Sequence, residues 1–190
     1  MPRASAADAA ATAARIRTVA AQRFAVDGYA ATSVDDVATD AGVTRGAVYH
    51  HYDSKPGLFA AVVARLQQEV ADAVVQAAGD GAGDDGLRRG SHAFLDAITA
   101  DGRARVLLRD APAVLTWETW RETDAQTSAV HLREALTGAG VAADMLGATT
   151  ALLSGAMNEA ALWLSERAGD AAARTAAHRG LDRLLDAVVD

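Results

Sequence analysis

The chain of 190 residues contains no cysteine, only three prolines and a single lysine, Lys55. Without cysteine it has no disulfide, no thiolate metal ligand and no cysteine nucleophile, and this fits a reducing compartment such as the cytoplasm. Because prolines are few and alanines are many, we expect helix nearly throughout and little disorder. A long apolar run is also missing, since the best stretch, Met145–Leu164, is broken by Asn158 and Glu159. We therefore expect a cytoplasmic protein without a membrane-spanning segment.

An excess of positive charge is missing as well, because the formal net charge of the chain is −7. This charge is unevenly distributed. Residues 1–55 hold six basic and six acidic side chains and balance to zero, whereas residues 56–190 carry the whole negative excess. A nucleic-acid-binding module at the N-terminus would therefore depend on a few well-placed cations rather than on bulk charge.

Apolar residues recur at helical spacing along the chain and predict an all-α fold of about nine helices. Glycines, N-cap residues and prolines set the expected helix ends. The run Gly79–Gly86 is rich in glycine and aspartate, so we expect a loop there after a long fourth helix. The nine expected helices are 11–27, 34–41, 45–50, 55–78, 87–100, 103–110, 112–136, 143–168 and 171–189. We expect two domains, residues 11–56 and residues 57–190.

Residues 34–51 have the pattern of a helix-turn-helix. Ser33 is followed three residues later by Asp36, which is the signature of a capping box at a helix start. Gly42 suits the turn because it adopts a backbone conformation that costs other residues free energy. Thr44 is then placed to cap the next short helix.

The apolar positions of this unit fit the same interpretation. Ala38 is small where the two helices must nearly touch, and Val48 can fill the space between them, together with Val34 and Val37. Two helices of this length are too small to be stable alone, and such a unit serves to present its second helix outward.

In two runs, GYAATSVDDVA starting at Gly28 and AGVTRGAVYHHYDSK ending at Lys55, the chain resembles the TetR family of bacterial regulators. The resemblance covers about residues 12–60. It implies an N-terminal helix-turn-helix DNA-binding domain, followed by a helical domain for ligand binding and dimerisation. It also implies repression of transcription that is relieved when a small molecule binds.

Candidate DNA contacts come from both helix starts and from the exposed side of the second helix. Free N–H groups and the positive dipole end of a helix N-terminus suit phosphates, and Gly46 permits close approach to the DNA backbone. Arg45 matches guanine O6 and N7 and is the main candidate for base reading, although a phosphate contact suits it nearly as well. The Tyr49 hydroxyl and the Lys55 amine suit phosphates, and Ala47 and His50 are secondary readers. The full candidate set is Thr32, Ser33, Thr44, Arg45, Gly46, Ala47, Tyr49, His50 and Lys55, and the resemblance implies DNA contacts at the same positions.

Beyond residue 80, three tryptophans and a few polar groups outline a candidate ligand pocket. Its residues are Trp117, Trp120, Met157, Asn158 and Trp163. Core packing is the alternative role for each tryptophan. We expect a largely apolar small-molecule effector and neither a cofactor nor a metal ion.

The last two expected helices, 143–168 and 171–189, carry apolar faces mixed with alanine and glycine, which let helices approach closely. We expect them to form a homodimer that binds a palindromic operator in double-stranded DNA.

An enzyme is not expected, because no nucleophile with a base, no paired carboxylates and no metal cluster has a recognisable spacing. The five histidines form no motif such as H-E-x-x-H. The sequence therefore predicts a ligand-responsive transcriptional regulator, with a repressor as the main interpretation. The alternative is a helical protein–protein adaptor without DNA binding, which the neutral N-terminal module supports.

Overall fold

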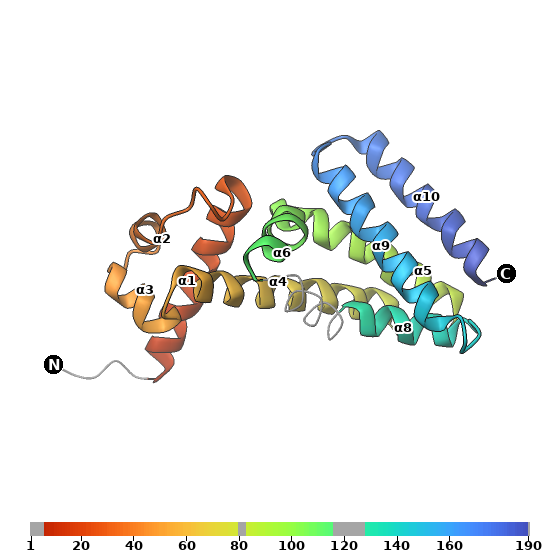
Figure 1. Ribbon diagram of the computed structural model, residues 1–190, viewed down its shortest axis with the longest axis horizontal. Coiled ribbons are helices and arrows are strands. Elements are labelled where there is room, and N and C mark those ends of the chain that lie inside the picture. The colour runs from red at the N-terminus through yellow and green to blue at the C-terminus, as the bar shows by residue number, and fades with distance from the viewer. Residues whose placement is uncertain (1–5, 80–82, 116–127, 190) are drawn as a thin grey trace.

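The computed structural model describes residues 6–79, 83–115 and 128–189. All regular structure in these residues is helical, which confirms the all-α prediction (Figure 1). None of the described helices is long and apolar enough to cross a membrane. The helices are α1 (Ala6–Asp27), α2 (Val34–Asp40), α3 (Arg45–Tyr52), α4 (Lys55–Ala78), α5 (Asp84–Thr99), the 3-10 turn η1 (Ala100–Gly102), the π-helical turn η2 (Arg105–Asp110), α6 (Ala111–Val114), α8 (Ser128–Gly138), α9 (Leu146–Ser165) and α10 (Ala171–Val189).

Helices α1, α2 and α3 pack with the first turns of α4 into a compact head at one end of the molecule (Figure 1). Three aromatic rings lie in its core. Phe24 and Phe59 meet edge to face with ring centroids 5.0 Å apart, and Tyr29 packs against Phe59 at 4.8 Å. Tyr52 ties α3 to α1, because its hydroxyl donates to the Ala13 carbonyl at 2.6 Å. The head is therefore held by ring packing and by a partly buried hydrogen bond between its first and third helices.

Helix α4 runs from the head along the body of the molecule (Figure 1). Ser54 caps its start by accepting a hydrogen bond from the Gly57 N–H at 3.0 Å, and Pro56 is tolerated because it lies in the first turn. One side of the helix is buried over almost its whole length. The buried residues are Leu58, Phe59, Val62, Val63, Leu66, Gln67, Val70 and Ala71.

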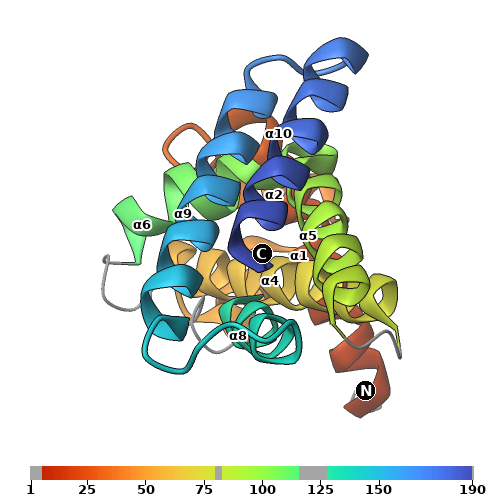
Figure 2. The same cartoon turned by 90° about the vertical axis from the view of Figure 1, so that its right-hand side faces the viewer.

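Helices α5, α8, α9 and α10 form the rest of the body with the second half of α4. The end view shows α9 and α10 side by side (Figure 2). Ion pairs fix α10 to α5: Arg88 bonds to Asp182 at 2.8 Å and to Asp186 at 2.6 Å, and His178 lies 3.1 Å from Asp96. Polar contacts at this seam leave much of the opposite face of α10 exposed.

Turn η2 connects the body to the head. The Arg105 guanidinium donates to the carbonyls of Val26 and Asp27, at 2.7 and 3.0 Å, in the last turn of α1. A cation suits this position because it satisfies free carbonyls at the negative end of the helix dipole. At the other end of η2 the Asp110 carboxylate accepts from the Tyr29 N–H at 2.9 Å. Both ends of η2 thus hold the end of α1.

Gly28 is required at this junction for two reasons. Its φ of +84° lies in the left-handed region that side chains rarely adopt, and a Cβ there would overlap the Arg105 guanidinium. The glycine that ends α1 therefore also makes room for the contact from the body.

The loop predicted over Gly79–Gly86 is too long, because α5 already begins at Asp84. Asp84 and Asp85 lie in the first turn of α5, where carboxylates interact favourably with the helix dipole. The acidic residues that indicated a loop therefore start a helix.

The single helix predicted over 112–136 is wrong. The chain is already helical before Pro112, in the π-helical turn η2, and α6 ends at Val114, where Leu115 leaves helical geometry with φ −92° and ψ 5°. Pro112 has no N–H to donate to a carbonyl of the preceding turn, and that turn is π-helical. Helix begins again in the described residues at α8.

Candidate nucleic-acid interface

Helices α2 and α3 form the predicted helix-turn-helix. Ala38 and Val48 are 4% and 1% exposed, so the small residue and the plug between the helices lie where the sequence places them. Gly42 has a φ of +62°, and the Val43 N–H donates to the Ala38 carbonyl at 3.0 Å across the turn. The turn and the core of the unit are therefore confirmed.

Both N-caps are present. The Ser33 hydroxyl accepts from the Asp36 N–H at 3.0 Å and donates to the Asp36 carboxylate at 2.6 Å. The bond that the Ser33 hydroxyl donates stabilises the charged form of the Asp36 carboxylate and lowers its pKa. Thr44 caps α3 by accepting from the Ala47 N–H at 3.1 Å. Thr32, in contrast, is only 3% exposed, and its hydroxyl donates to the Gly28 carbonyl at 2.9 Å, so its side chain supports the loop from inside.

Arg45 lies at the start of α3 and is held from two sides. One of its nitrogens bonds to the Asp35 carboxylate of α2 at 2.9 Å, and another donates to the Tyr49 hydroxyl at 3.3 Å. Arg45 and Asp35 are 59% and 60% exposed, and a pair so open to solvent adds little stability. Its effect is to hold the guanidinium and the phenol together on the outer side of α3.

Gly46 is an exposed helical glycine that the fold does not require. A Cβ there would meet only the Thr44 hydroxyl, at an ordinary 3.8 Å, and its φ is not in the left-handed region. Glycine in a helix costs about 0.5–1 kcal/mol relative to alanine. Beside it Ala47 is half-buried and His50 is exposed. The outer side of α3 is therefore kept free of bulk at the cost of some helix stability.

Lys55 begins α4 next to this surface. Its amine lies 4.3 Å from the centre of the Tyr29 ring and 3.4 Å from the Ala30 carbonyl oxygen, so ring and carbonyl hold the charge at the edge of the head. Burial of the Tyr29 phenol raises its pKa. The one lysine of the chain is thus held in place rather than free in solvent.

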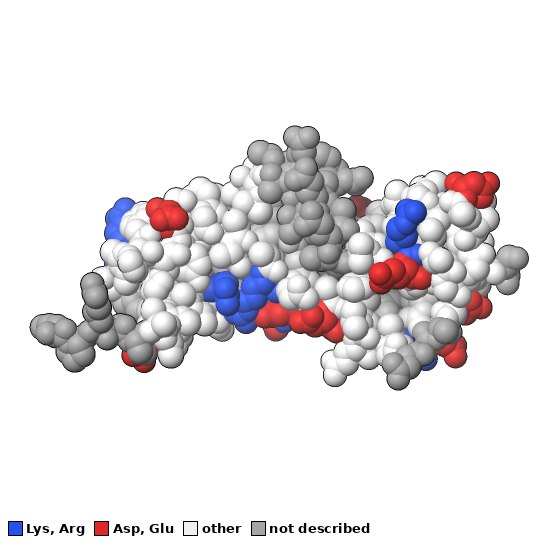
Figure 3. Space-filling view, turned by 90° about the horizontal axis from the view of Figure 1, so that it is seen from below, with Lys and Arg blue, Asp and Glu red and all other residues white. Residues whose placement is uncertain are grey.

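On the face of the molecule seen in Figure 3, basic residues lie beside acidic ones. Seen from below, blue and red side chains lie next to one another and form no basic stripe (Figure 3). Arg23, for example, bonds to Asp40 at 2.7 Å and to Asp27 at 3.4 Å. This agrees with the zero net charge of residues 1–55, and it leaves affinity for a polyanion to a few positioned groups.

Two family models match the chain. Residues 16–62 match "Bacterial regulatory proteins, tetR family", and residues 85–188, more than half of the chain, match "Tetracyclin repressor-like, C-terminal domain". The chain belongs to the TetR family. This TetR-family protein is 34% identical to a TetR-family transcriptional regulator from Pectobacterium atrosepticum, whose crystal structure matches with a TM-score of 0.73 and 97% of each chain covered. A TetR-family structure from Rhodococcus sp. has a TM-score of 0.76, with 94% of this chain and 98% of that chain covered, but at 18% identity it shows the fold alone.

Two regulators from Pseudomonas putida match part of this TetR-family protein. SrpR and TtgW, both HTH-type transcriptional regulators, are each 42% identical to it over 67 residues, which is 35% of this chain. The matched segment spans about a third of SrpR (32%) and half of TtgW (50%). The family places this chain among DNA-binding transcriptional regulators and not among enzymes.

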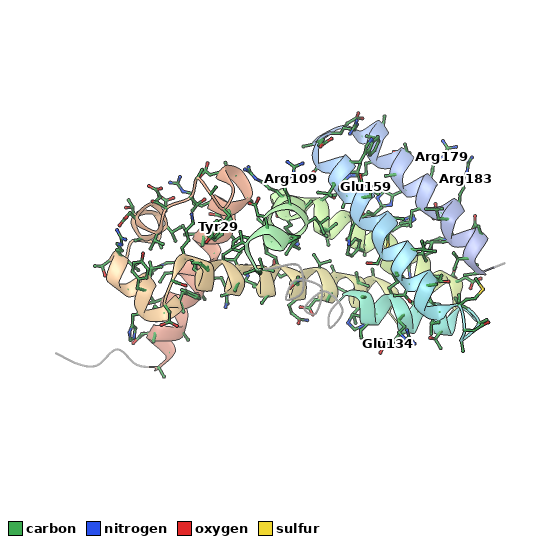
Figure 4. All side chains as sticks on the ribbon, viewed as in Figure 1. Tyr29, Arg109, Glu134, Glu159, Arg179 and Arg183 are labelled. Carbon is green, nitrogen blue, oxygen red and sulfur yellow. The ribbon has the colours of Figure 1, made fainter. Side chains whose placement is uncertain are left out.

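Sequence reasoning missed two residues of this surface in the TetR-family protein. Asp35 orients Arg45 from another helix, and Tyr29 lies beneath the Lys55 amine; Figure 4 labels Tyr29 where α1 meets α4. The available signal for Asp35 was a carboxylate in the first turn of α2, which also fits a simple dipole interaction. Only the packing of α2 against α3, which brings the Asp35 carboxylate to Arg45, shows that Asp35 also orients the guanidinium.

The residues predicted to form a ligand pocket do not all lie together. Met157 is 5% exposed and lines both an inner cavity between α4, α5 and α8 and an outer groove between α9 and α10. Trp163 lines the groove and is 39% exposed. The described lining of the inner cavity includes neither Asn158 nor Trp163, and Trp117 and Trp120 lie outside the described residues.

The alanine variant of Gly46 separates folding from DNA binding. We expect Gly46→Ala to leave the melting temperature unchanged or raise it, because alanine favours helix by about 0.5–1 kcal/mol and meets no steric overlap. We expect affinity for an operator duplex, measured by fluorescence anisotropy, to fall about tenfold or more, or ~1.4 kcal/mol, since the methyl group blocks close approach. Unchanged affinity would show that this part of α3 does not approach DNA.

Proposed function

We propose that this protein is a homodimeric transcriptional repressor that binds a palindromic operator through α3 and releases it when a small, largely apolar effector binds the body. The observation that carries the DNA contact is the outer side of α3, where Arg45 is oriented by Asp35 and a helical glycine is kept without a structural need. The match of residues 85–188 to a tetracycline-repressor-like domain supports effector-controlled repression. The repressor acts in the cytoplasm, where its operator lies.

In the proposed complex α3 enters the major groove. Arg45 reads a guanine edge, with Ala47 and His50 as secondary readers. The N-termini of α2 and α3, which Ser33 and Thr44 cap, face phosphates. Gly46, Tyr49 and Lys55 also face phosphates, and these contacts set the position of the head on the duplex. Thr32 supports this surface from within, because its hydroxyl is already bonded.

The proposed dimer uses the exposed face of α9 and α10. Leu152 is 74% exposed and Leu184 is 49% exposed, and they lie among exposed alanines and glycines that let helices approach closely. Arg179 and Arg183 project from α10 away from the body, while Glu159 lies on α9 (Figure 4). Because this face carries apolar side chains and both signs of charge, it is complementary to a second copy of itself.

Two-fold symmetry then places the two α3 helices on successive major grooves, about 34–36 Å apart or somewhat more. The effector acts by binding more tightly to a form of the dimer in which this spacing is wrong, because a ligand shifts an equilibrium only through differential affinity.

Selection of binding sites from a random duplex library by the purified full-length protein tests this function. Enrichment of a palindrome supports it. Absence of any enriched sequence, together with no binding at low salt, would contradict it and favour a protein–protein adaptor.

We expect substitutions at Lys55 and Arg45 to reduce affinity for the selected operator in different ways. Lys55→Ala leaves one phosphate without its cation, so the slope of log affinity against log salt becomes shallower by about one unit for each such phosphate, while Lys55→Arg keeps the charge and the slope.

Arg45→Ala costs ~1–3 kcal/mol of binding free energy on the operator and much less on duplexes already changed at the base pair that Arg45 reads. Asp35→Ala keeps the guanidinium but not its orientation, and it gives a smaller reduction of the same kind.

Equal reductions in affinity for Arg45→Ala on all duplexes, with a shallower salt slope, would make Arg45 a phosphate contact. Sequence reading would then fall to Ala47, His50 or the shape of the DNA.

Leu152→Glu tests the proposed dimer. A carboxylate on the α9–α10 face would be desolvated in the dimer, whereas the same side chain is exposed in the folded protomer. We therefore expect monomers of unchanged helical content by sedimentation velocity and circular dichroism. Val26→Glu is the matched control, because Val26 is equally exposed, at 75%, but lies on the head. If Leu152→Glu stayed dimeric, another face would have to form the dimer.

A further inference from the structure

The inner cavity between α4, α5 and α8 has a volume of about 280 Å³ and lies in the body, away from α3. It is partly open to solvent, because its lining includes the exposed side chains of Val75 and Glu134. Its walls are mainly apolar side chains and glycines. Val74 and Ala78 come from α4, Phe94 from α5, Leu132 from α8 and Met157 from α9. A cavity of about 150 Å³ with such walls holds benzene, so this volume suits a molecule of on the order of ten non-hydrogen atoms.

One buried hydroxyl in this wall finds no partner. Ser91 of α5 is 4% exposed, and its oxygen has no hydrogen bond within the described residues. Several other helical hydroxyls of the body donate to the carbonyl four residues earlier, as Thr99 does to Leu95 at 2.6 Å and Thr137 to Arg133 at 2.9 Å. A buried polar group without a partner costs free energy, and a ligand that supplied a partner would recover it.

The charged groups of the cavity wall limit the chemistry of the ligand. Neither lysine nor arginine occurs in its described lining. The charged or titratable members are His131, which is 3.3 Å from Glu134, and Glu134 itself, which Figure 4 labels at the outer edge of α8. An anion in the cavity would be desolvated without a permanently charged cation to pair with and would lie near a carboxylate.

We propose that this cavity is the effector site and that it takes a small, neutral, largely apolar molecule with one hydroxyl or carbonyl group, which Ser91 binds. The inference rests on the proposed effector response and moves its site from the tryptophans to the seam of α4, α5 and α8. Because Val74, Val75 and Ala78 belong to the helix that also packs into the head, a ligand between α4 and α8 bears directly on head orientation.

Three matched probes test the chemistry on the full-length protein without DNA, by ligand-observed NMR and thermal shift. They are 2-phenylethanol, ethylbenzene, which lacks the hydroxyl, and phenylacetate, which carries a charge. We expect 2-phenylethanol to bind most tightly, ethylbenzene more weakly and phenylacetate not at all. Binding of phenylacetate as tight as that of 2-phenylethanol, or binding of none of the three, would overturn the proposal.

Two kinds of variant test the site. Ser91→Ala should weaken the binding of 2-phenylethanol about 3- to 10-fold, which corresponds to the loss of one hydrogen bond, and leave the affinity for ethylbenzene unchanged. Ser165→Ala is the matched control, because its hydroxyl is bonded to the Leu162 carbonyl and lies outside the described lining of this cavity. Ala135→Leu fills the cavity and should abolish binding of both neutral probes, and Ala129→Leu does so from another part of α8 if the first variant fails to fold.

Wild-type affinity for 2-phenylethanol in both leucine variants would place binding elsewhere and overturn the site, as would equal effects of Ser91→Ala on 2-phenylethanol and ethylbenzene. Operator release is measured separately with the same probes. Ser91-dependent binding without operator release would leave the site standing and contradict the effector response of the proposed function. The converse result is a compound that releases the operator while binding Ala135→Leu and Ala129→Leu as tightly as the unchanged protein. That result would support the effector response of the proposed function and contradict this cavity as its site.

Discussion

Helix α4 buries one apolar stripe in both halves of the molecule, and the arrangement of the rest depends on it. Phe59 packs among the aromatic rings of the head, while Val70 lies three turns later in the body. Because interiors are close-packed, neither half can move against the other without shifting this helix or opening a void. The head is therefore not a free module on a linker, and its position follows that of α4.

Turn η2 adds the second constraint. Arg105 satisfies the last carbonyls of α1, and Asp110 binds the backbone just beyond them, so the body holds α1 at its end while α4 holds the head from below. With two attachments at different points, a tilt of α4 has to break or bend the contacts of Arg105. In the proposed regulator this makes two discrete head orientations more favourable than a continuous range, as a bistable response to an effector requires.

The sequence predicts best what depends on near neighbours. The caps at Ser33 and Thr44 and the plug at Val48 follow from residues within one or two turns, so the helix-turn-helix and the all-α fold are readable from the chain. Arg105 meets Val26 across 79 positions, and nothing local to either residue indicates that contact. Similarly, Ser91 resembles any helical serine until the packing of α5 leaves its hydroxyl without a partner. The helix-turn-helix with its caps and its core was therefore largely predictable, whereas the junction and the inner cavity depend on tertiary packing.

The distance between the two heads of the proposed dimer tests most directly whether α4 and η2 together hold each head in place. The chain has no cysteine, so Ala11→Cys gives one nitroxide label per protomer, on the exposed side of α1. We expect double electron–electron resonance spectroscopy to show one narrow distribution of label-to-label distances, and we expect this distribution to broaden in the Arg105→Met variant. It should stay narrow on Arg89→Met, which removes the same kind of contact, to the Ala77 and Ala78 carbonyls, at the far end of α4. A broad distribution in the otherwise unchanged chain, or no response to Arg105→Met, would contradict a head held by α4 and η2 together.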